Sequence, residues 1–304
     1  MFDSSNSNNE DNINVLIRIR PRENNSSSTL LKINENKIET SNMSYQFNYI
    51  ADENSTQNDI FENCAKKICD YCLEGYNGTI LAYGQTGSGK TYTLFGPKFF
   101  LNNMNNYEEI INTNENNYYN FDIKDESIGL LPRIIYYLFN KTKNNSYTFK
   151  ISYFEIYQEN LNDLLHPEYK DLIIYNTENK NNEKIKGLRK FLFNSPEEGL
   201  KYIIQGSKLR KIASTKMNDE SSRSHAVITI YIENSIEEDG IKLKKNRKFH
   251  IIDLAGSERQ KKTESTGERV IEAGSINKSL SILGRVINNI IKKILNQFLI
   301  ENQN

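Results

Sequence analysis

The sequence has few cysteines, no long apolar run and no net charge, and each of these absences excludes a class of protein. Three cysteines among 304 residues cannot form a disulfide framework. Cys64, Cys69 and Cys72 also lack a fourth ligand and the spacing of a zinc site, so we expect free, buried or half-buried thiols in a reducing compartment. No apolar run reaches the roughly 18 residues of a transmembrane helix, and the first residues lack the basic and apolar regions of a signal peptide. The 39 basic and 39 acidic side chains cancel, which argues against a globally basic nucleic-acid-binding protein.

The residue in excess is asparagine, and its distribution predicts how the chain is organised. Isoleucine, tyrosine and phenylalanine are plentiful as well, so we expect a globular body that carries polar insertions. Residues 1–12 contain mainly Ser, Asn and acidic side chains and are predicted to be a disordered tail. The body is expected over residues 13–291, with Asn-rich polar insertions near 98–127 and 176–184. Residues 292–304 are predicted to be a divergent extension.

Strand-like and helix-like segments alternate along the body. This order predicts an α/β fold with a largely parallel sheet and one antiparallel hairpin, whose turn is the Asp-Gly pair at 239–240. The expected strands cover 13–20, 79–83, 147–157, 226–234 and 242–253. The expected helices cover 56–73, 129–143, 195–208 and 276–298, and residues 160–165 are expected to begin a turn or short helix.

Residues 84–91 form a phosphate-binding motif. They match the pattern G-x-x-x-x-G-K-[ST] with Gly84, Gln85, Thr86, Gly87, Ser88, Gly89, Lys90 and Thr91. The glycines let backbone N–H groups approach phosphate oxygens, Lys90 reaches the β- and γ-phosphates, and the Thr91 hydroxyl ligates Mg²⁺. A short apolar strand precedes the motif and a helix-forming segment follows it, as a P-loop requires.

Two further segments have the chemistry of nucleotide sensors. An apolar strand ends at Asp253, where a carboxylate can hold Mg²⁺ through water, and the N–H of Gly256 can reach a γ-phosphate. The segment from Asn218 to His225 is rich in hydroxyls and contains Arg223. Hydroxyls can bind Mg²⁺ or water and a guanidinium can pair with phosphate charge, although a hydroxyl-rich loop before a strand is also commonplace.

The three motifs GQTGSGKT, NDESSRSH and DLAGSE, in this order, resemble the kinesin motor domain. The stretches RIRP at 18–21, YFEIYQENLNDLL at 153–165 and INKSLSILGRVI at 276–287 extend the resemblance. The resemblance implies a P-loop NTPase with a central mixed sheet of eight strands and helices on both faces. In this family the segment 218–225 is called switch I and the segment 253–258 switch II.

The resemblance also implies a role for each matching residue, with ATP and Mg²⁺ as cofactors. Arg18, Pro21 and Tyr92 would flank the adenine ring, and the P-loop together with Asn218 and Ser221 would complete the nucleotide contacts. Thr91, Ser222 and Asp253 would serve the metal, and Ser222, Arg223, Gly256 and Glu258 would be the catalytic group. An Arg223–Glu258 pair would position the attacking water, so a strong general base is not required. His225 is predicted to be structural.

The implied function is a microtubule-stimulated ATPase whose hydrolysis of Mg-ATP drives movement. Its partner would be tubulin, contacted through the switch II helix near Lys278, since an acidic track attracts basic side chains. No membrane or nucleic-acid partner is expected. The expected location is the cytoplasm and the microtubule cytoskeleton, with the spindle as one candidate. The alternative is a non-motile protein that binds microtubules, or acts as a scaffold, in a nucleotide-dependent manner.

The sequence departs from the family pattern after about residue 289. A YRDSKLT-like stretch, a second tubulin-contact helix, the last core strand, the final helix and the neck linker are not found. The chain is therefore expected to be an incomplete motor domain. It could be a piece of a longer chain, a motor that binds nucleotide without moving, or a motor completed by a partner. Dimerisation cannot be read because the neck and stalk are absent.

Overall fold

The structure, a computed structural model, describes most of the expected domain. The described residues are 13–21, 30–34, 36–40, 43–97, 126, 128–143, 146–169, 172–175, 185–216, 222–238, 241–258, 278–290 and 292. The predicted tail, both polar insertions and the C-terminal extension therefore lie outside the described residues, apart from 126 and 292. Among the described helices, none has the length and apolarity to cross a membrane.

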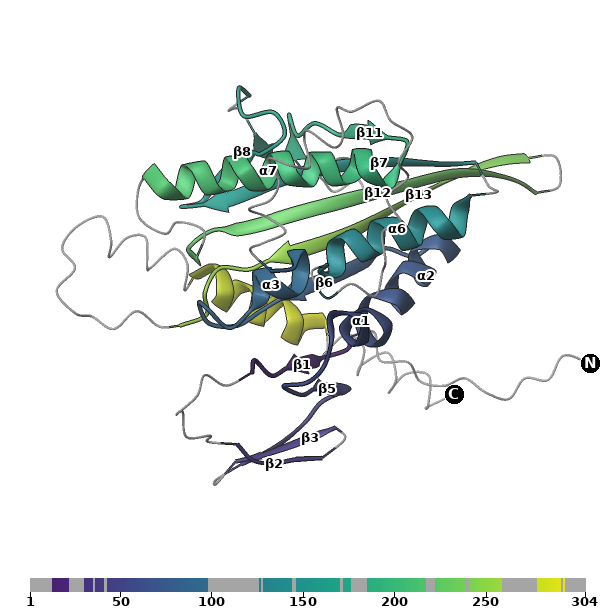
Figure 1. Cartoon of the computed structure of the whole chain (residues 1–304). Coiled ribbons are helices and arrows are strands. Elements are labelled where there is room, and N and C mark those ends of the chain that lie inside the picture. The colour runs from purple at the N-terminus through teal and green to yellow at the C-terminus, as the bar shows by residue number, and fades with distance from the viewer. Residues whose placement is uncertain are drawn as a thin grey trace, which may run out of the picture.

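A mixed sheet of six strands forms the centre of the fold (Figure 1). Its strands are β6 (Gly78–Ala82), β7 (Tyr147–Tyr157), β8 (Asn160–Asp163), β11 (Phe191–Phe193), β12 (His225–Glu238) and β13 (Ile241–Asp253). The order is β11-β7-β12-β13-β6, with β8 against β7. Only the β13–β6 pairing is parallel among these strands. The mixed sheet is confirmed, but the largely parallel arrangement is wrong, because β7 and β8, and likewise β12 and β13, are successive antiparallel strands without a crossover helix between them.

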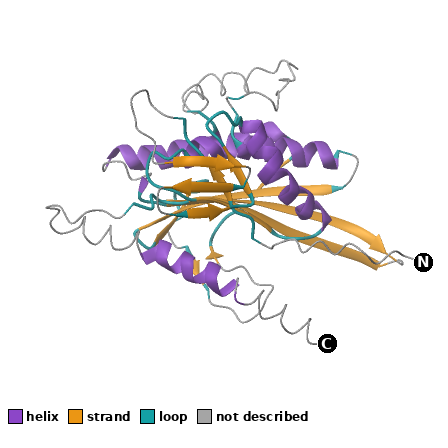
Figure 2. Cartoon of the chain, turned by 90° about the horizontal axis from the view of Figure 1, so that it is seen from below, coloured by secondary structure: helices purple, strands orange, loops and turns teal. Residues whose placement is uncertain are grey.

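Helices cover both faces of this sheet (Figure 2). They are α1 (Gln57–Ile60), the π-helical turn η1 (Phe61–Ala65), α2 (Lys66–Glu74), α3 (Lys90–Phe95), α6 (Leu130–Thr142), α7 (Pro196–Lys216) and a helix over residues 278–290. The α6 helix packs against α2, α3 and α7, and α7 packs on β7 and β11. Helix 278–290 lies on the opposite side of the sheet from α6 and α7 (Figure 2).

Capping residues explain where two of these helices begin. The Thr56 hydroxyl accepts from the backbone N–H of Asp59 and the Asp59 carboxylate accepts from the N–H of Thr56, at 3.1 and 2.9 Å. At the start of α7 the hydroxyl of Ser195 accepts from the N–H of Glu198 at 3.2 Å. The Glu198 carboxylate accepts from the N–H of Asn194 at 2.7 Å. The α7 helix therefore begins where it is expected, although it continues to Lys216, beyond its expected end.

Residues 160–165 correct one prediction, because 160–163 form strand β8 rather than a turn or short helix. Gln158 and Glu159 adopt φ values of 48° and 66°, which reverse the chain within two residues. The chain therefore returns as a hairpin strand against β7. Neither residue is a glycine, so the sequence carries no signal for this turn.

The hydrophobic core lies between the sheet and its helices, and it contains Leu131, Ile151 and Phe249. Cys69 and Cys72 are buried in this core, Cys64 is half-buried, and all three are free, which confirms the burial and the free thiols predicted for them. Burial raises the pKa of the Cys64 thiol to about 11.

The remaining strands lie outside the central sheet. β1 (Leu16–Arg18) pairs in parallel with β5 (Tyr49–Ala51); β2 (Leu30–Asn34), β3 (Lys37–Thr40) and β4 (Ser44–Gln46) form a separate sheet, and β9 (Ile173–Ile174) pairs with β10 (Ile185–Lys186). The second edge of β6 has no strand neighbour within the described ranges. A cavity of about 2820 Å³ is lined by residues of both β1 and β6. The central sheet of the described part has six strands, whereas the resemblance implies eight.

Candidate nucleotide site

The P-loop connects the end of β6 to the start of α3, as the motif predicts. Gly87 and Gly89 have φ values of 78° and 105°, a region that a glycine enters without steric cost. Lys90 is the first residue of α3, and its ammonium donates to the carbonyls of Gly84 and Gln85 at 2.9 and 3.0 Å. Burial lowers the pKa of Lys90, with the charges of acidic neighbours opposing this shift. The lysine that would meet the β- and γ-phosphates therefore folds over its own loop.

Thr91 and Asp253 form the candidate magnesium site. The Thr91 hydroxyl donates to Oδ2 of Asp253 at 3.0 Å, although the two residues are 162 positions apart. Asp253 is only 3% exposed, and its Oδ1 is buried without a hydrogen-bond partner in the described structure. A hydroxyl beside a carboxylate oxygen with free lone pairs suits a hydrated Mg²⁺. The described residues contain no cluster of three His, Cys, Asp or Glu side chains, so phosphate oxygens would have to complete the coordination.

Switch II is hydrogen-bonded to both the P-loop and switch I. The N–H of Ser257 donates to the carbonyl of Gly84 at 3.1 Å, and the N–H of Gly256 donates to the carbonyl of Ser222 at 2.8 Å. The N–H predicted to reach the γ-phosphate is thus occupied by switch I. It would become available to phosphate when the bond to Ser222 opens.

Glu258 and Arg223 are the predicted water-positioning pair. The Glu258 carboxylate accepts from the backbone N–H of Thr86 at 2.8 Å and also from the Thr86 hydroxyl. Burial raises the pKa of Glu258, but these bonds with Thr86 outweigh it and leave the pKa below its ordinary value. The Arg223–Glu258 pairing stays a prediction. Asn218 and Ser221 lie outside the described residues.

Arg18 and Tyr92 meet at the predicted adenine position. The Arg18 guanidinium lies 5.1 Å from the centre of the Tyr92 ring, and it donates to Oε1 of Gln57 at 2.9 Å. Pro21 is exposed at the end of the same segment. Two neighbours of this position, Gln57 and Arg20, were not predicted. The guanidinium of Arg20 donates to the carbonyl of Gly87. The RIRP stretch was a signal for Arg20, whereas nothing local marks Gln57.

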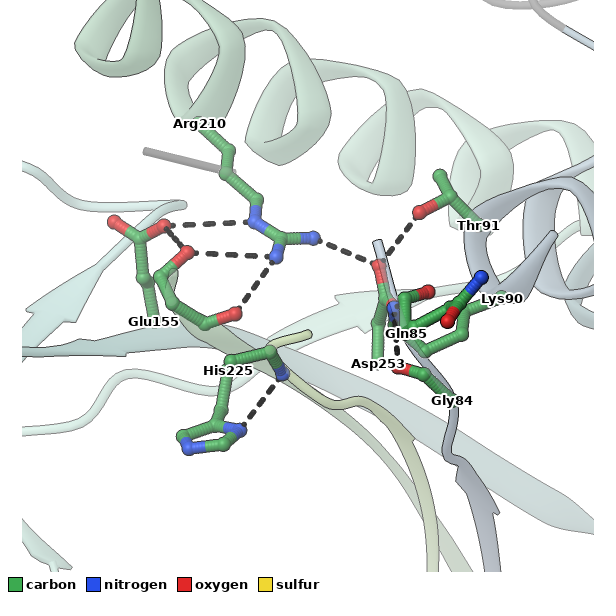
Figure 3. Close-up of polar contacts among 10 residues, drawn as sticks. Gly84, Gln85, Lys90, Thr91, Glu155, Arg210, His225 and Asp253 are labelled. Carbon is green, nitrogen blue, oxygen red and sulfur yellow. Dashed lines mark hydrogen bonds and ion pairs between the residues drawn. The ribbon is translucent and has the colours of Figure 1, made fainter. Parts of the chain in front are cut away.

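A second missed group surrounds Asp253 on the side away from Thr91 (Figure 3). Arg210 of α7 donates to Oδ2 of Asp253 at 3.0 Å and to the carbonyl of Ser224 at 3.1 Å. The Glu155 carboxylate lies 3.5 Å from the Arg210 guanidinium and accepts from the Ser224 hydroxyl at 2.5 Å. Arg210 and Glu155 come from α7 and β7, far along the chain from the motifs that contain Ser224 and Asp253, which is why no spacing motif reveals them.

His225 and Lys278 relate the site to helix 278–290. The ring of His225 accepts from the N–H of Ala255 at its Nδ1, at 3.0 Å, and its Nε2 lies 2.7 Å from the Ser279 hydroxyl. Lys278 is 62% exposed and lies 3.5 Å from the carboxylate of Glu159. The structural role predicted for His225 thus has named partners, and the tubulin contact of Lys278 stays a prediction.

One family model and two known proteins match most of this chain. The family model for the kinesin motor domain matches residues 2–302. Kinesin-like protein KIP1 of Saccharomyces cerevisiae is 38% identical over 271 residues, which cover 83% of this chain and 23% of that protein. Kinesin-like protein KIF15 of Homo sapiens is 38% identical over 269 residues, which cover 86% of this chain and 18% of that protein. The chain thus spans about a fifth of the length of these relatives.

A solved structure, described as that of a fast kinesin, has a TM-score of 0.74 and 33% sequence identity to this chain. The match covers 91% of this chain and 74% of that one. The mixed sheet therefore agrees with the fold of that structure, and the chain belongs to the kinesin motor domain family.

Proposed function

We propose that this chain binds and hydrolyses Mg-ATP and that it couples this reaction to microtubule binding and movement. The observation that carries the proposal is the convergence of Thr91, Asp253 and the Ser222–Gly256 bond beside Lys90. A hydroxyl and a carboxylate that could hold a metal, together with a contact between the two switches, thus lie around one candidate phosphate-binding loop. The family membership supports the same reaction and the same partner.

Each residue has a role in the proposed reaction. The P-loop N–H groups and Lys90 bind the β- and γ-phosphates. Thr91 and Asp253 would hold Mg²⁺, which neutralises phosphate charge when bound. Opening of the Ser222–Gly256 bond would free the Gly256 N–H for the γ-phosphate. Ser222 and an Arg223–Glu258 pair would then orient the attacking water. Since the protein mainly positions groups and neutralises charge, no strong general base is needed.

Coupling to the track would run through switch II and helix 278–290. The exposed ammonium of Lys278 is available to an acidic surface once its surface pair with Glu159 is exchanged, and such exposed pairs contribute only about 0–1 kcal/mol. Nucleotide-dependent changes at Gly256 would reach this helix through Ala255 and His225. Microtubules, and hence the cytoskeleton, are the partner and location that this arrangement favours.

Steady-state ATP hydrolysis by wild type and Lys90→Ala, with and without microtubules, tests the proposal. Lys90→Ala should lose nucleotide binding and turnover, because the phosphate charge loses its main cationic partner. Lys66→Ala is a matched control, since Lys66 is a surface lysine that pairs with Glu62 within the same helical segment. Equal rates for wild type and Lys90→Ala would contradict the proposal.

Co-sedimentation with microtubules separates the motor from the non-motile alternative. A motor should show nucleotide-dependent binding together with microtubule-stimulated turnover. Binding that responds to a nonhydrolysable ATP analogue without any turnover would favour the nucleotide-dependent binding or scaffold protein.

A further inference from the structure

Arg210 is a buried charged group next to the nucleotide site that the proposed mechanism does not use. It lies in α7 and is 7% exposed, and its partners Glu155, Ser224 and Asp253 are 6%, 0% and 3% exposed. Burying a guanidinium is costly unless its donors are matched by acceptors. Here the acceptors come from β7, from the end of switch I and from the start of switch II (Figure 3).

The guanidinium of Arg210 faces Asp253 on one side and Ser224 and Glu155 on the other. Its Nη1 donates to Oδ2 of Asp253 at 3.0 Å. Its Nη2 donates to the carbonyl of Ser224 at 3.1 Å and lies 3.4 Å from the Ser224 hydroxyl, while Nε lies 3.5 Å from Glu155. The planar fork of arginine faces these directions at once, which the single ammonium of a lysine cannot do, although in the described structure Nε makes the ion pair with Glu155 and no hydrogen bond.

The charges around Arg210 hold it ionised. Burial acts to lower the pKa of Arg210, but the Asp253 and Glu155 carboxylates outweigh this, and the pKa stays above its ordinary value. Two carboxylates, those of Glu155 and Asp253, thus flank one guanidinium, and the Asp253 carboxylate is the one that also reaches Thr91 of the P-loop.

The two oxygens of Asp253 are placed in different environments. Oδ2 accepts from both Arg210 and Thr91, each at 3.0 Å. Oδ1 is buried and has no hydrogen-bond partner in the described structure. With Oδ2 held from two sides the carboxylate cannot rotate freely, so Oδ1 keeps its lone pairs for a metal-bound water.

We propose that Arg210 is the positioning residue that orients Asp253 for Mg²⁺ and thereby sets the magnesium dependence of nucleotide binding. The inference rests on the proposed function, since it concerns the metal of the same site. The same guanidinium holds the Ser224 carbonyl, so the orientation of Asp253 is tied to the end of switch I. Loss of such an outer partner typically lowers metal affinity by about 10–100-fold.

The test is a Mg²⁺ titration of the affinity for a fluorescent ADP analogue, in wild type and Arg210→Lys. Lysine keeps the charge but loses the fork. The Mg²⁺ concentration for half-maximal tightening should rise about tenfold or more, in line with the loss of an outer partner. The affinity measured in excess EDTA should be nearly unchanged, because the phosphate contacts of the P-loop are intact. A merely structural role would weaken both affinities together.

Arg133→Lys is the matched control. Arg133 is a fully buried arginine in α6 whose donors reach the carbonyl of Ile128 at 3.1 Å and Oδ1 of Asn58 at 3.3 Å. It should alter stability without altering the Mg²⁺ dependence. A shift in Arg133→Lys as large as that in Arg210→Lys would overturn the proposal, because the effect would then follow from any buried arginine.

A second variant tests the role of Arg210 if far-UV circular dichroism shows that Arg210→Lys does not fold. Glu155→Gln keeps the shape of the side chain and an acceptor for Ser224, but it removes the charge that holds Arg210. It should shift the Mg²⁺ dependence in the same direction by a smaller factor. Unshifted Mg²⁺ dependence in the folded variants, with a normal wild type, overturns this inference alone. A wild type without any Mg²⁺-dependent nucleotide binding overturns the proposed function and this inference with it.

Discussion

Ser279→Ala should weaken the connection between switch II and helix 278–290 by a limited and measurable amount. His225 lies between them, 3.0 Å from the Ala255 backbone nitrogen and 2.7 Å from the Ser279 hydroxyl. A backbone N–H can only donate, so Nδ1 of the ring accepts, and a neutral ring then has its proton on Nε2. Ser279 therefore accepts a hydrogen bond from His225.

The structure sets the size of each effect. Removal of the Ser279 hydroxyl deletes its hydrogen bond with His225, and a neutral hydrogen bond of this kind contributes about 0.5–1.5 kcal/mol to the free energy of unfolding. His225→Ala should cost more, because it also leaves the N–H of the fully buried Ala255 without its acceptor, a penalty of about 1–3 kcal/mol. Once His225 is removed, Ser279→Ala should have little further effect. The double variant should therefore be less destabilised than the sum of the two single variants by about 1 kcal/mol.

Urea denaturation followed by far-UV circular dichroism measures these energies, and the absence of tryptophan makes this a better probe than intrinsic fluorescence. Ser281→Ala is the matched control, since Ser281 is exposed in the same helix. It corrects for the higher helix propensity of alanine, which stabilises both variants. Equal stabilities for Ser279→Ala and Ser281→Ala, or strict additivity in the double variant, would refute the proposed link.

Three further outcomes follow from buried groups and from glycines. Burial lowers the pKa of both His225 and His250, so the unfolded chain binds protons that the folded chain does not. The free energy of unfolding should fall as the pH drops below about 6.5, by up to ~1.4 kcal/mol per pH unit for each histidine. His250→Gln should reduce this dependence of the free energy of unfolding on pH. Urea titrations at pH 7.5 and 5.5, which bracket the ordinary histidine pKa of about 6.5, measure it. An unchanged dependence would contradict the lowered pKa of His250. Gly206→Ala should destabilise by about 1–3 kcal/mol in thermal denaturation, because its Cβ would lie 2.2 Å from the buried ring of Tyr153. Gly284→Ala meets no atom within 4 Å in a helix and should instead stabilise by about 0.5–1 kcal/mol; a loss of stability there would count against the described helix.

The parts of the fold that the sequence predicted are those with local causes. The helix that begins after Thr56 has its capping partner three residues away, and the P-loop is defined by eight consecutive residues. Strand β8 was missed because its turn depends on positive φ values at Gln158 and Glu159, two residues without a strong preference for that region. A turn of this kind is imposed by the pairing of the strands rather than by the turn residues.

The part of the site that the sequence did not predict has causes far along the chain. Arg210 lies 43 residues before Asp253, and Glu155 lies 69 residues before Ser224. The predicted end of α7 near Lys208 also left Arg210 outside the helix, whereas the helix continues to Lys216. The packing of α7 on β7 brings the Arg210 guanidinium to the carboxylates of Glu155 and Asp253. The residue pattern within one segment does not show which distant segment will pack against it.

Near the start of β12, Ser224 and His225 are held by more buried contacts than Ser222. From His225 onward, β12 pairs with β7 on one side and, from Ala226, with β13 on the other, so its backbone is held along its whole length. Ser224 is held by Arg210 and Glu155, which are themselves buried. Ser222 precedes these anchors, and its carbonyl is held by the N–H of Gly256. In the proposed mechanism, a γ-phosphate that takes this N–H would release switch I at Ser222 while Ser224 and His225 keep their positions. The movement would then pass into switch II and, through Ala255 and His225, to helix 278–290, because β12 itself has no freedom to absorb it.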